Sequence, residues 1–258
     1  MPESDWSAVD AAADPRRLLS GLDALRSEPF FAESKDRMAT LVAGMHAARV
    51  LDVGCGTGED AAGLDAPAIG IERSVVMCKE ARARHAELEL VVADAAAIPI
   101  RDAHVDAVRA DRVLQHLRGV PAALREWRRV LQPGGLLITF DPDLATASVD
   151  GVDEHAASAV LAWRVTTRPG AATLRMLRPA LEASGFVEIR VEPWALELTD
   201  LGRADGIMGL ATWGHAAADA GVLSPGDARR WNDDVHTSAR TGTLRYRCSY
   251  LLTSATAG

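Results

Sequence analysis

The stretch Arg49-Val-Leu-Asp-Val-Gly-Cys-Gly-Thr-Gly58 joins a short apolar run to three glycines that alternate with other residues. The apolar run is typical of a strand buried on both faces, and the residues after Gly58 predict a helix. Glycines here permit a tight turn and let backbone N–H groups approach a ligand with no Cβ in between. The GxGxG spacing differs from the GxGxxG that places a pyrophosphate over the helix N-terminus. It therefore favours a nucleoside without phosphates.

Outward from this loop, short apolar runs alternate with helical patterns. The strand at 49–53 is followed by expected strands at 68–71, 88–93, 105–110, 136–140, 186–191 and 244–252, with expected helices at 59–64, 74–85, 113–117, 121–131, 151–167 and 171–183. This alternation predicts an α/β fold with a parallel sheet and crossover helices. Helical patterns at 14–25 and 34–45 precede the first strand and predict a lid over one end of the sheet. The segment 193–242 is far longer than a turn requires, so we expect an insertion there.

Composition limits the kind of protein this is. The 258 residues, of which 48% are hydrophobic, are enough for one globular domain with a subdomain. Three widely spaced cysteines predict a reducing, cytoplasmic setting, and the acidic start of the chain is unlike a signal peptide. The net charge of −8 and the lack of a long apolar run argue against nucleic acid and membrane as partners. We expect a small-molecule substrate and a monomer or homodimer.

Two acidic residues end the strands that follow the glycine loop. Glu72 closes Ile69-Gly-Ile-Glu72, where a carboxylate can accept hydrogen bonds from both ribose hydroxyls. Asp94 closes Val91-Val-Ala-Asp94, where it can accept from an adenine amino group while the Ala95 N–H faces a ring nitrogen. Each acid alone is more typical of a solvated strand end or a helix cap. Their order on successive strands, at the edge where open α/β sheets bind ligands, predicts a nucleoside site.

Together these motifs resemble the class I S-adenosylmethionine-dependent methyltransferases, in particular the ubiquinone/menaquinone-biosynthesis-like branch. The resemblance rests on Leu51–Gly58, Glu72, Asp94 with Ile98-Pro99, Val105-Asp-Ala-Val108 and Leu131-Gln-Pro-Gly-Gly135, and covers roughly residues 30 to 192. It implies a Rossmann-like, seven-stranded, mostly parallel sheet with an antiparallel last strand, and S-adenosyl-L-methionine as cofactor. We expect a helical N-terminal lid at 1–46 and a methyltransferase domain at 47–258, with a helical substrate-side insertion at 193–243. The branch often has Asp where this chain has Glu72.

The resemblance also suggests which residues bind the cofactor. Asp111 would approach its amino group, while Arg112, or Lys35 from the lid, would hold its carboxylate. A surface ion pair is the alternative for each of these three. The full set of candidate cofactor residues is Lys35, Asp52, Gly54, Cys55, Gly56, Glu72, Arg73, Asp94, Ala95, Asp111 and Arg112.

Candidates for catalysis and substrate binding come from outside this set. A general base, where one is needed, could be His116, Asp141 or His215. His116 is four residues after Arg112, so a helix would place both on one face. The alternative for each candidate is a polar cap or a structural histidine. Large apolar side chains of the later segments predict a substrate pocket, for which the candidates are Trp163, Trp194, Trp213 and His215.

The predicted reaction is methyl transfer to an oxygen, nitrogen or carbon atom of a small, moderately apolar molecule in secondary metabolism. Two alternatives remain open. A non-methylating cyclase or regulatory protein would keep the same cofactor site, and an NAD(P)-dependent oxidoreductase would also place an acid near a ribose. The GxGxG spacing and Asp94 argue against the oxidoreductase. We expect no metal, because Asp141 and Asp143 alone do not form a carboxylate cluster.

Overall fold

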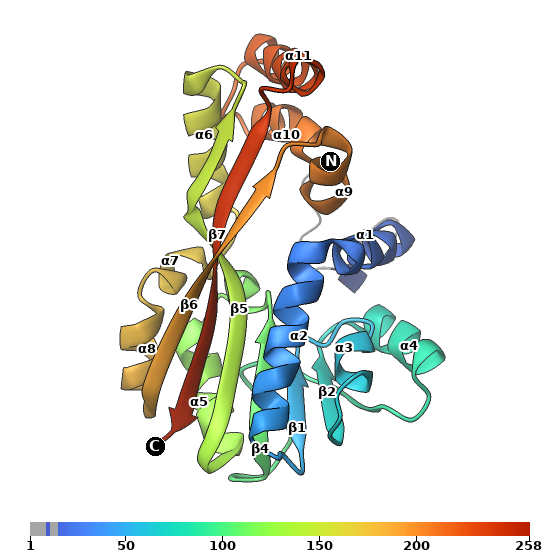
Figure 1. Cartoon of the computed structure of the whole chain (residues 1–258), viewed down its shortest axis with the longest axis vertical. Helices are drawn as coiled ribbons and strands as arrows, with labels where there is room; N and C mark the ends of the chain where they lie inside the picture. The colour runs from blue at the N-terminus through green and yellow to red at the C-terminus, as the bar shows by residue number, and fades with distance from the viewer. Residues whose placement is uncertain (1–8, 11–14) are drawn as a thin grey trace.

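A computed structural model describes residues 9–10 and 15–258 and contains a seven-stranded sheet with strand order β3-β2-β1-β4-β5-β7-β6 (Figure 1). The strands are β1 (Val50–Val53), β2 (Ala68–Glu72), β3 (Glu89–Val92), β4 (Val105–Asp111), β5 (Leu131–Asp150), β6 (Phe186–Leu198) and β7 (Arg245–Ala257). The first five are parallel, and β7 runs antiparallel between β5 and β6. The predicted sheet with an antiparallel last strand is thereby confirmed.

Helices cover the sheet on both faces and at one end (Figure 1). The N-terminal pair, α1 (Pro15–Ser27) and α2 (Pro29–Gly44), is called the lid below. Between strands lie α3 (Glu59–Ala62), α4 (Val75–Arg84), the short 3-10 helix η2 (Leu114–His116) and α5 (Val120–Val130), followed by α6 (Glu154–Thr166), α7 (Ala171–Leu174) and α8 (Leu177–Ala183). The segment between β6 and β7 contains α9 (Leu201–Met208), η3 (Leu210–Thr212), α10 (Trp213–Asp219) and α11 (Pro225–Thr241).

Alternating residues of the strands pack into two hydrophobic cores, one on each face of the sheet. On one face, Val50 and Ile138 pack with Phe31 and Met38 of α2. On the other face, the neighbouring positions pack against α5 and α8, with Trp127 fully buried. A strand buried on both faces reads as a continuous apolar run, which is why the sequence located these strands correctly.

The sequence underestimated two strands. β5 runs to Asp150 and β6 runs to Leu198, well beyond the predicted ends at 140 and 191. Their far halves are joined through β7, where Ser148 pairs with Arg247 and Leu198 pairs with Tyr246. The first six residues of the predicted insertion at 193–243 are therefore strand. Past Leu198, the helical character of the insertion agrees with the prediction.

The far ends of β5, β6 and β7 support a group of helices, α6, α9, α10 and α11, which we call the cap (Figure 1). The cap lies beyond the carboxyl ends of the parallel strands. Its interior contains Trp213 stacked on Trp231, with ring centroids 6.4 Å apart, and the Arg164 guanidinium lies 3.7 Å from the Trp213 ring centroid. Trp213 is only 1% exposed and donates its indole N–H to the Met208 carbonyl. We therefore correct its assignment: Trp213 is a core residue of the cap, without a surface for substrate.

Candidate functional site

The glycine loop leaves β1 in a conformation that only glycine adopts readily. Gly54, Gly56 and Gly58 all have positive φ, between 55° and 83°. The Gly54 N–H donates to the Ile71 carbonyl at 2.7 Å, and a Cβ on Gly54 would lie 2.6 Å from Cγ2 of Val113. The loop is thus held between the end of β2 and the segment that follows β4. Any side chain at Gly54 would force these two walls apart.

Glu72 lies at the end of β2 beside this loop. One carboxylate oxygen accepts the Gly56 N–H at 3.2 Å, and the other accepts the Ser74 N–H at 2.7 Å. Burial raises the pKa of Glu72, and these two backbone donors oppose that rise. A carboxylate offers about four acceptor positions, so two remain after the backbone bonds. That number suits the two hydroxyl groups of a ribose.

The other predicted nucleoside residues lie around Glu72. Asp94 is exposed at the end of β3, where it accepts the Ala96 N–H at 2.8 Å, and the Ala95 carbonyl accepts from the Trp127 indole. Arg73 is exposed. The Cys55 thiol turns back towards β2, where a Cβ on Gly70 would lie 2.7 Å from its sulfur, so Cys55 packs the loop through its side chain.

A buried ionic group lies beneath the loop. Arg109, in the middle of β4, is 2% exposed and places a guanidinium nitrogen 3.3 Å from both carboxylate oxygens of Asp52 and another 3.4 Å from Asp60. Burial raises the pKa of Asp52 to about 6 despite this cation, whereas for Asp60 the charges of Arg109 and Lys35 outweigh burial and lower the pKa. Asp52 thus supports the loop from below.

Next to this group, the end of β4 gathers one acid and two bases. The Lys35 ammonium lies 2.8 Å from Asp111 and also bonds Asp60, and Arg112 Nε lies 3.4 Å from Asp111. Burial alone would raise the pKa of Asp111, but Lys35, Arg112 and Arg109 hold it below its ordinary value. Arg112 has φ +57°, and its buried Nε has no hydrogen-bond partner. A carboxylate flanked by two cations is complementary to a group that carries both an amine and a carboxylate.

The lid closes over the glycine loop. Leu22 of α1 would lie 3.7 Å from a Cβ on Gly56, and Arg26 pairs with Glu59 at 3.0 Å. Arg84 of α4 pairs with Asp23 of α1 at 2.9 Å. The lid is therefore joined to both helices that follow the first two strands.

The lid also contacts the cap. The carboxylate of Glu28, 7% exposed, receives two hydrogen bonds from Arg203 of α9, one of them at 3.1 Å. At its other end, α2 reaches β6 through the Arg37–Glu192 pair at 2.7 Å. The lid therefore connects the cofactor side of the molecule with the cap side.

Asp141 is held on the opposite face of the sheet from Asp111. Phe140 pairs with Asp111 across the two strands, so these two side chains share a face of the sheet. Because successive residues of a strand point to alternate faces, Asp141 points to the other one. One Asp141 oxygen accepts the Gln115 N–H at 3.2 Å, the other has no hydrogen-bond partner, and burial raises the pKa of Asp141 well above its ordinary value. Asp141 therefore faces away from Asp111 and holds the backbone of η2 through the Gln115 N–H. We therefore reassign Asp141 from candidate base to a residue that positions η2.

The two histidine candidates differ in position. His116 ends η2, but Arg112 is left-handed and precedes that helix, so the prediction that the two share a helical face is wrong. His215 is exposed on α10 in the cap.

Five rings meet beside Asp111 and form what we call the aromatic cluster: Phe30, Phe31, Phe140, Trp194 and Tyr250. Among the predicted pocket residues, Trp194 belongs to it, and Trp163 is half-buried on α6. Sequence reasoning missed Phe30 and Tyr250 because their proximity depends on the lid and on β7 pairing. It also missed Arg109, although an arginine inside a doubly buried strand signals a buried acid nearby.

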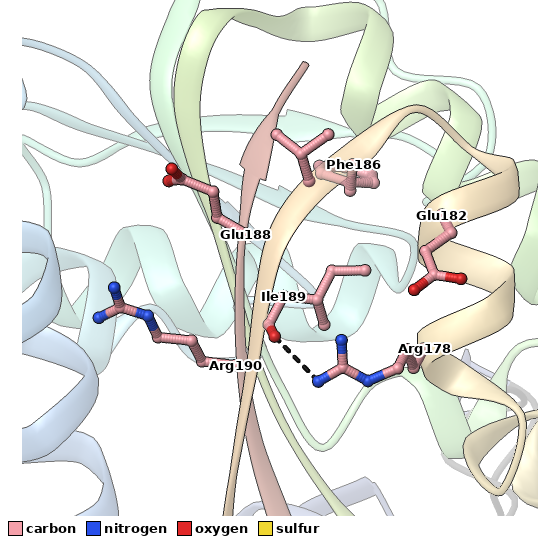
Figure 2. Close-up of a pocket in the computed structure, with 7 residues that line it drawn as sticks. Arg178, Glu182, Phe186, Glu188, Ile189 and Arg190 are labelled. Atoms are coloured by element: carbon pink, nitrogen blue, oxygen red, sulfur yellow. Dashed lines mark hydrogen bonds between the residues drawn. The ribbon is translucent and has the colours of Figure 1, made fainter.

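A cavity lies elsewhere, on the outer edge of β6 (Figure 2). It measures about 580 Å³ and lies between β6 and α8. Arg178 reaches across it to donate to the Ile189 carbonyl at 2.9 Å, while Arg190 projects from the other side of the strand (Figure 2). This open groove is separate from the glycine loop and from the aromatic cluster.

Gly170 packs against the backbone of η2, the short helix that follows Asp111 and Arg112. Its N–H donates to the Gln115 carbonyl at 3.0 Å, and a Cβ on Gly170 would lie 1.8 Å from the Leu114 carbonyl oxygen. Because two backbones meet there, Gly170→Ala is expected to lower the free energy of unfolding by about 1–3 kcal/mol through overpacking. Urea unfolding measures this, with Gly206→Ala as control because its Cβ would meet nothing within 4 Å. Equal stability of the two variants would contradict the close contact.

Within residues 9–10 and 15–258, no three His, Cys, Asp or Glu side chains are grouped as a metal site would require. Over the same ranges, no helix combines the length and apolarity needed to cross a membrane.

Comparison with known proteins gives methyltransferases among the matches. A family model described as a methyltransferase domain matches residues 51–139. A malonyl-[acyl-carrier protein] O-methyltransferase of Enterobacter lignolyticus is 30% identical over 196 residues, covering 71% of this chain and 69% of that protein. A demethylmenaquinone methyltransferase of Renibacterium salmoninarum is 35% identical over 98 residues, covering 36% of this chain and 40% of that protein.

The solved structures agree on the fold. The YcgJ protein of Bacillus subtilis superposes with a TM-score of 0.59 at 15% identity, covering 87% of this chain and 98% of that one. Among the curated relatives, however, the matched region is often partial: the chain spans 56%, 35% and 40% of the length of three of them.

Proposed function

Since this chain belongs to the class I S-adenosylmethionine-dependent methyltransferase family, we propose that it transfers a methyl group to a small, moderately apolar molecule. The observation that supports this most is the grouping of Asp111 with Lys35 and Arg112 beside the glycine loop. An acid between two bases is complementary to the amino-acid end of S-adenosylmethionine, while Glu72 keeps two acceptor positions for its ribose. The proposal includes a role in secondary metabolism and a cytoplasmic setting.

In this proposal the residues of the chain bind, orient and exclude water. Glu72 and Asp94 hold the nucleoside end, and Asp111, Lys35 and Arg112 hold the amino-acid end. S-adenosylmethionine supplies a methyl group already activated by its sulfonium, so alignment of the acceptor accounts for much of the catalysis. The lid, which lies over Gly56, keeps water from the reacting atoms.

Calorimetry tests the cofactor part of this proposal. S-adenosylmethionine and S-adenosylhomocysteine are expected to bind with micromolar Kd, and NADH is expected to bind far more weakly. Asp94→Ala should weaken the binding of S-adenosylmethionine and of S-adenosylhomocysteine about tenfold, because one hydrogen bond to a charged group is lost. Asp102→Ala is the matched control, since Asp102 is an exposed acid whose side chain is 78% accessible and pairs only with Arg129 at the surface. Tight binding of NADH alone would contradict the proposal.

Product analysis tests the reaction itself. Incubation with S-adenosylmethionine and a panel of small acceptors should yield S-adenosylhomocysteine together with a product heavier by one methylene unit. Conversion of an acceptor without S-adenosylhomocysteine formation, in a protein that binds the cofactor tightly, would instead favour the cyclase alternative.

A further inference from the structure

Both helices of the lid contact the same short segment, the start of α3 (Figure 1). Arg26, in the last turn of α1, lies 3.0 Å from Glu59 and 3.6 Å from Asp60. Lys35 of α2 bonds Asp60 with its ammonium group. Glu59 and Asp60 are the first two residues of α3 and come directly after Gly58. The lid is thus joined to the segment that directly follows the glycine loop.

Of these two acids, Asp60 also contacts the interior of the protein. Its carboxylate lies 3.4 Å from the guanidinium of Arg109, which is buried in the middle of β4. Burial alone would raise the pKa of Asp60, but the charges of Arg109 and Lys35 hold it below its ordinary value. Asp60 is therefore an anion at neutral pH, and it attracts one base from the sheet and one from each lid helix.

The Lys35 ammonium is shared between two acids. It bonds Asp60 of α3 and lies 2.8 Å from Asp111 at the end of β4. An ammonium group has three N–H donors, so a third donor can serve the cofactor carboxylate while two serve these acids. The stem of a lysine side chain is flexible, and a single anion would fix the ammonium poorly. Two anions from different elements fix it in one place.

We propose that Asp60 is a positioning residue, which places the Lys35 ammonium beside Asp111, where the amino-acid end of the cofactor binds. This inference rests on the proposed function and adds to it a residue that acts through Lys35. Because Asp60 also pairs with Arg26, the same carboxylate holds α1 and α2 against the start of α3. Binding of the amino-acid end is thereby linked to the closed position of the lid.

Two ligands separate this role from a general effect on the fold. S-adenosylhomocysteine carries the amino-acid end, whereas adenosine carries only the nucleoside that Glu72 and Asp94 are proposed to hold. In calorimetric titrations, Asp60→Asn is expected to weaken S-adenosylhomocysteine binding about tenfold and to leave the affinity for adenosine unchanged. Asp65→Asn is the matched control, because Asp65 is an exposed acid shortly after α3. Equal weakening of both ligands, or of neither, in folded Asp60→Asn protein would overturn the proposal.

Variants of Lys35 give a second test, which does not depend on the folding of Asp60→Asn. Lys35→Met removes the ammonium through which Asp60 acts, so it should also weaken S-adenosylhomocysteine about tenfold and leave adenosine unchanged. The double variant Asp60→Asn with Lys35→Met should bind S-adenosylhomocysteine about as weakly as Lys35→Met alone. Unchanged affinity in Lys35→Met, or losses that multiply in the double variant, would overturn the proposal. Failure of the wild-type protein to bind either ligand would instead count against the proposed function.

Discussion

Replacing Arg109 with methionine is expected to lower the free energy of unfolding by about 3–5 kcal/mol, the usual cost of removing one partner of a buried ion pair. Arg109 and Asp52 are each 2% exposed, so Asp52 would keep a buried charge without its cation. Asp60, 3.4 Å from Arg109, would lose a partner as well. Denaturant unfolding at neutral pH measures the effect. A loss below about 1 kcal/mol would mean that the pair behaves like an exposed one.

The pH dependence of this variant follows from Asp52. Its pKa in the folded protein is raised to about 6, above the ordinary value of 3.8, so ionisation costs stability as the pH rises through that range. Without Arg109 the folded-state pKa should rise further. The variant is therefore expected to be least impaired near pH 5 and most impaired above pH 7. The double variant Arg109→Met with Asp52→Asn should recover part of the loss, because one uncompensated charge is gone.

Glu72→Ala is expected to weaken S-adenosylhomocysteine binding about a hundredfold or more, since hydrogen bonds to a charged group contribute about 1.5–3 kcal/mol each. Two contributions add in the same direction. The variant loses the two acceptor positions proposed for the ribose, and it also releases the Gly56 and Ser74 N–H groups that Glu72 holds. Calorimetry with S-adenosylhomocysteine measures the loss.

Glu72→Gln separates charge from shape. The amide is nearly isosteric, but its NH₂ would face one of two backbone donors and leave that N–H without an acceptor. We expect Glu72→Gln to lose most of the affinity that Glu72→Ala loses. Glu87→Ala, an exposed acid after α4, is the control. Full affinity in Glu72→Gln would show that neither the backbone contacts nor the ribose needs the carboxylate.

Sequence reasoning worked where burial leaves a local pattern. The strand at Val50–Val53 and the glycines after it could be read directly, because a doubly buried strand must be apolar and a left-handed turn favours glycine. The far half of β5 left no such pattern. Asp143-Leu-Ala-Thr-Ala-Ser148 mixes polar and small residues at the register shift, so the extension depends on pairing with β7.

The sequence predicted which residues belong to the site better than it predicted the contacts between their side chains. Asp111, Lys35 and Arg112 were expected near one another because the resemblance assigned them to one end of the cofactor. Side-chain direction was harder to predict. Asp141 lies on the strand that was predicted but faces the opposite side, and the left-handed φ of Arg112 breaks the helical spacing to His116. These side-chain directions depend on tertiary packing, and residue spacing along the chain does not predict them.

The way the cap is joined to the sheet has a consequence for how such proteins diversify. The segment from α9 to α11 leaves the sheet after Leu198 and returns at Arg245, and Leu198 pairs directly with Tyr246. Its two ends are therefore fixed side by side by backbone hydrogen bonds, whatever lies between them. The entropy cost of closing the segment between these two ends rises only slowly with the length of the segment. The segment from α9 to α11 can thus be exchanged, by evolution or by grafting, while the glycine loop and its acids stay intact.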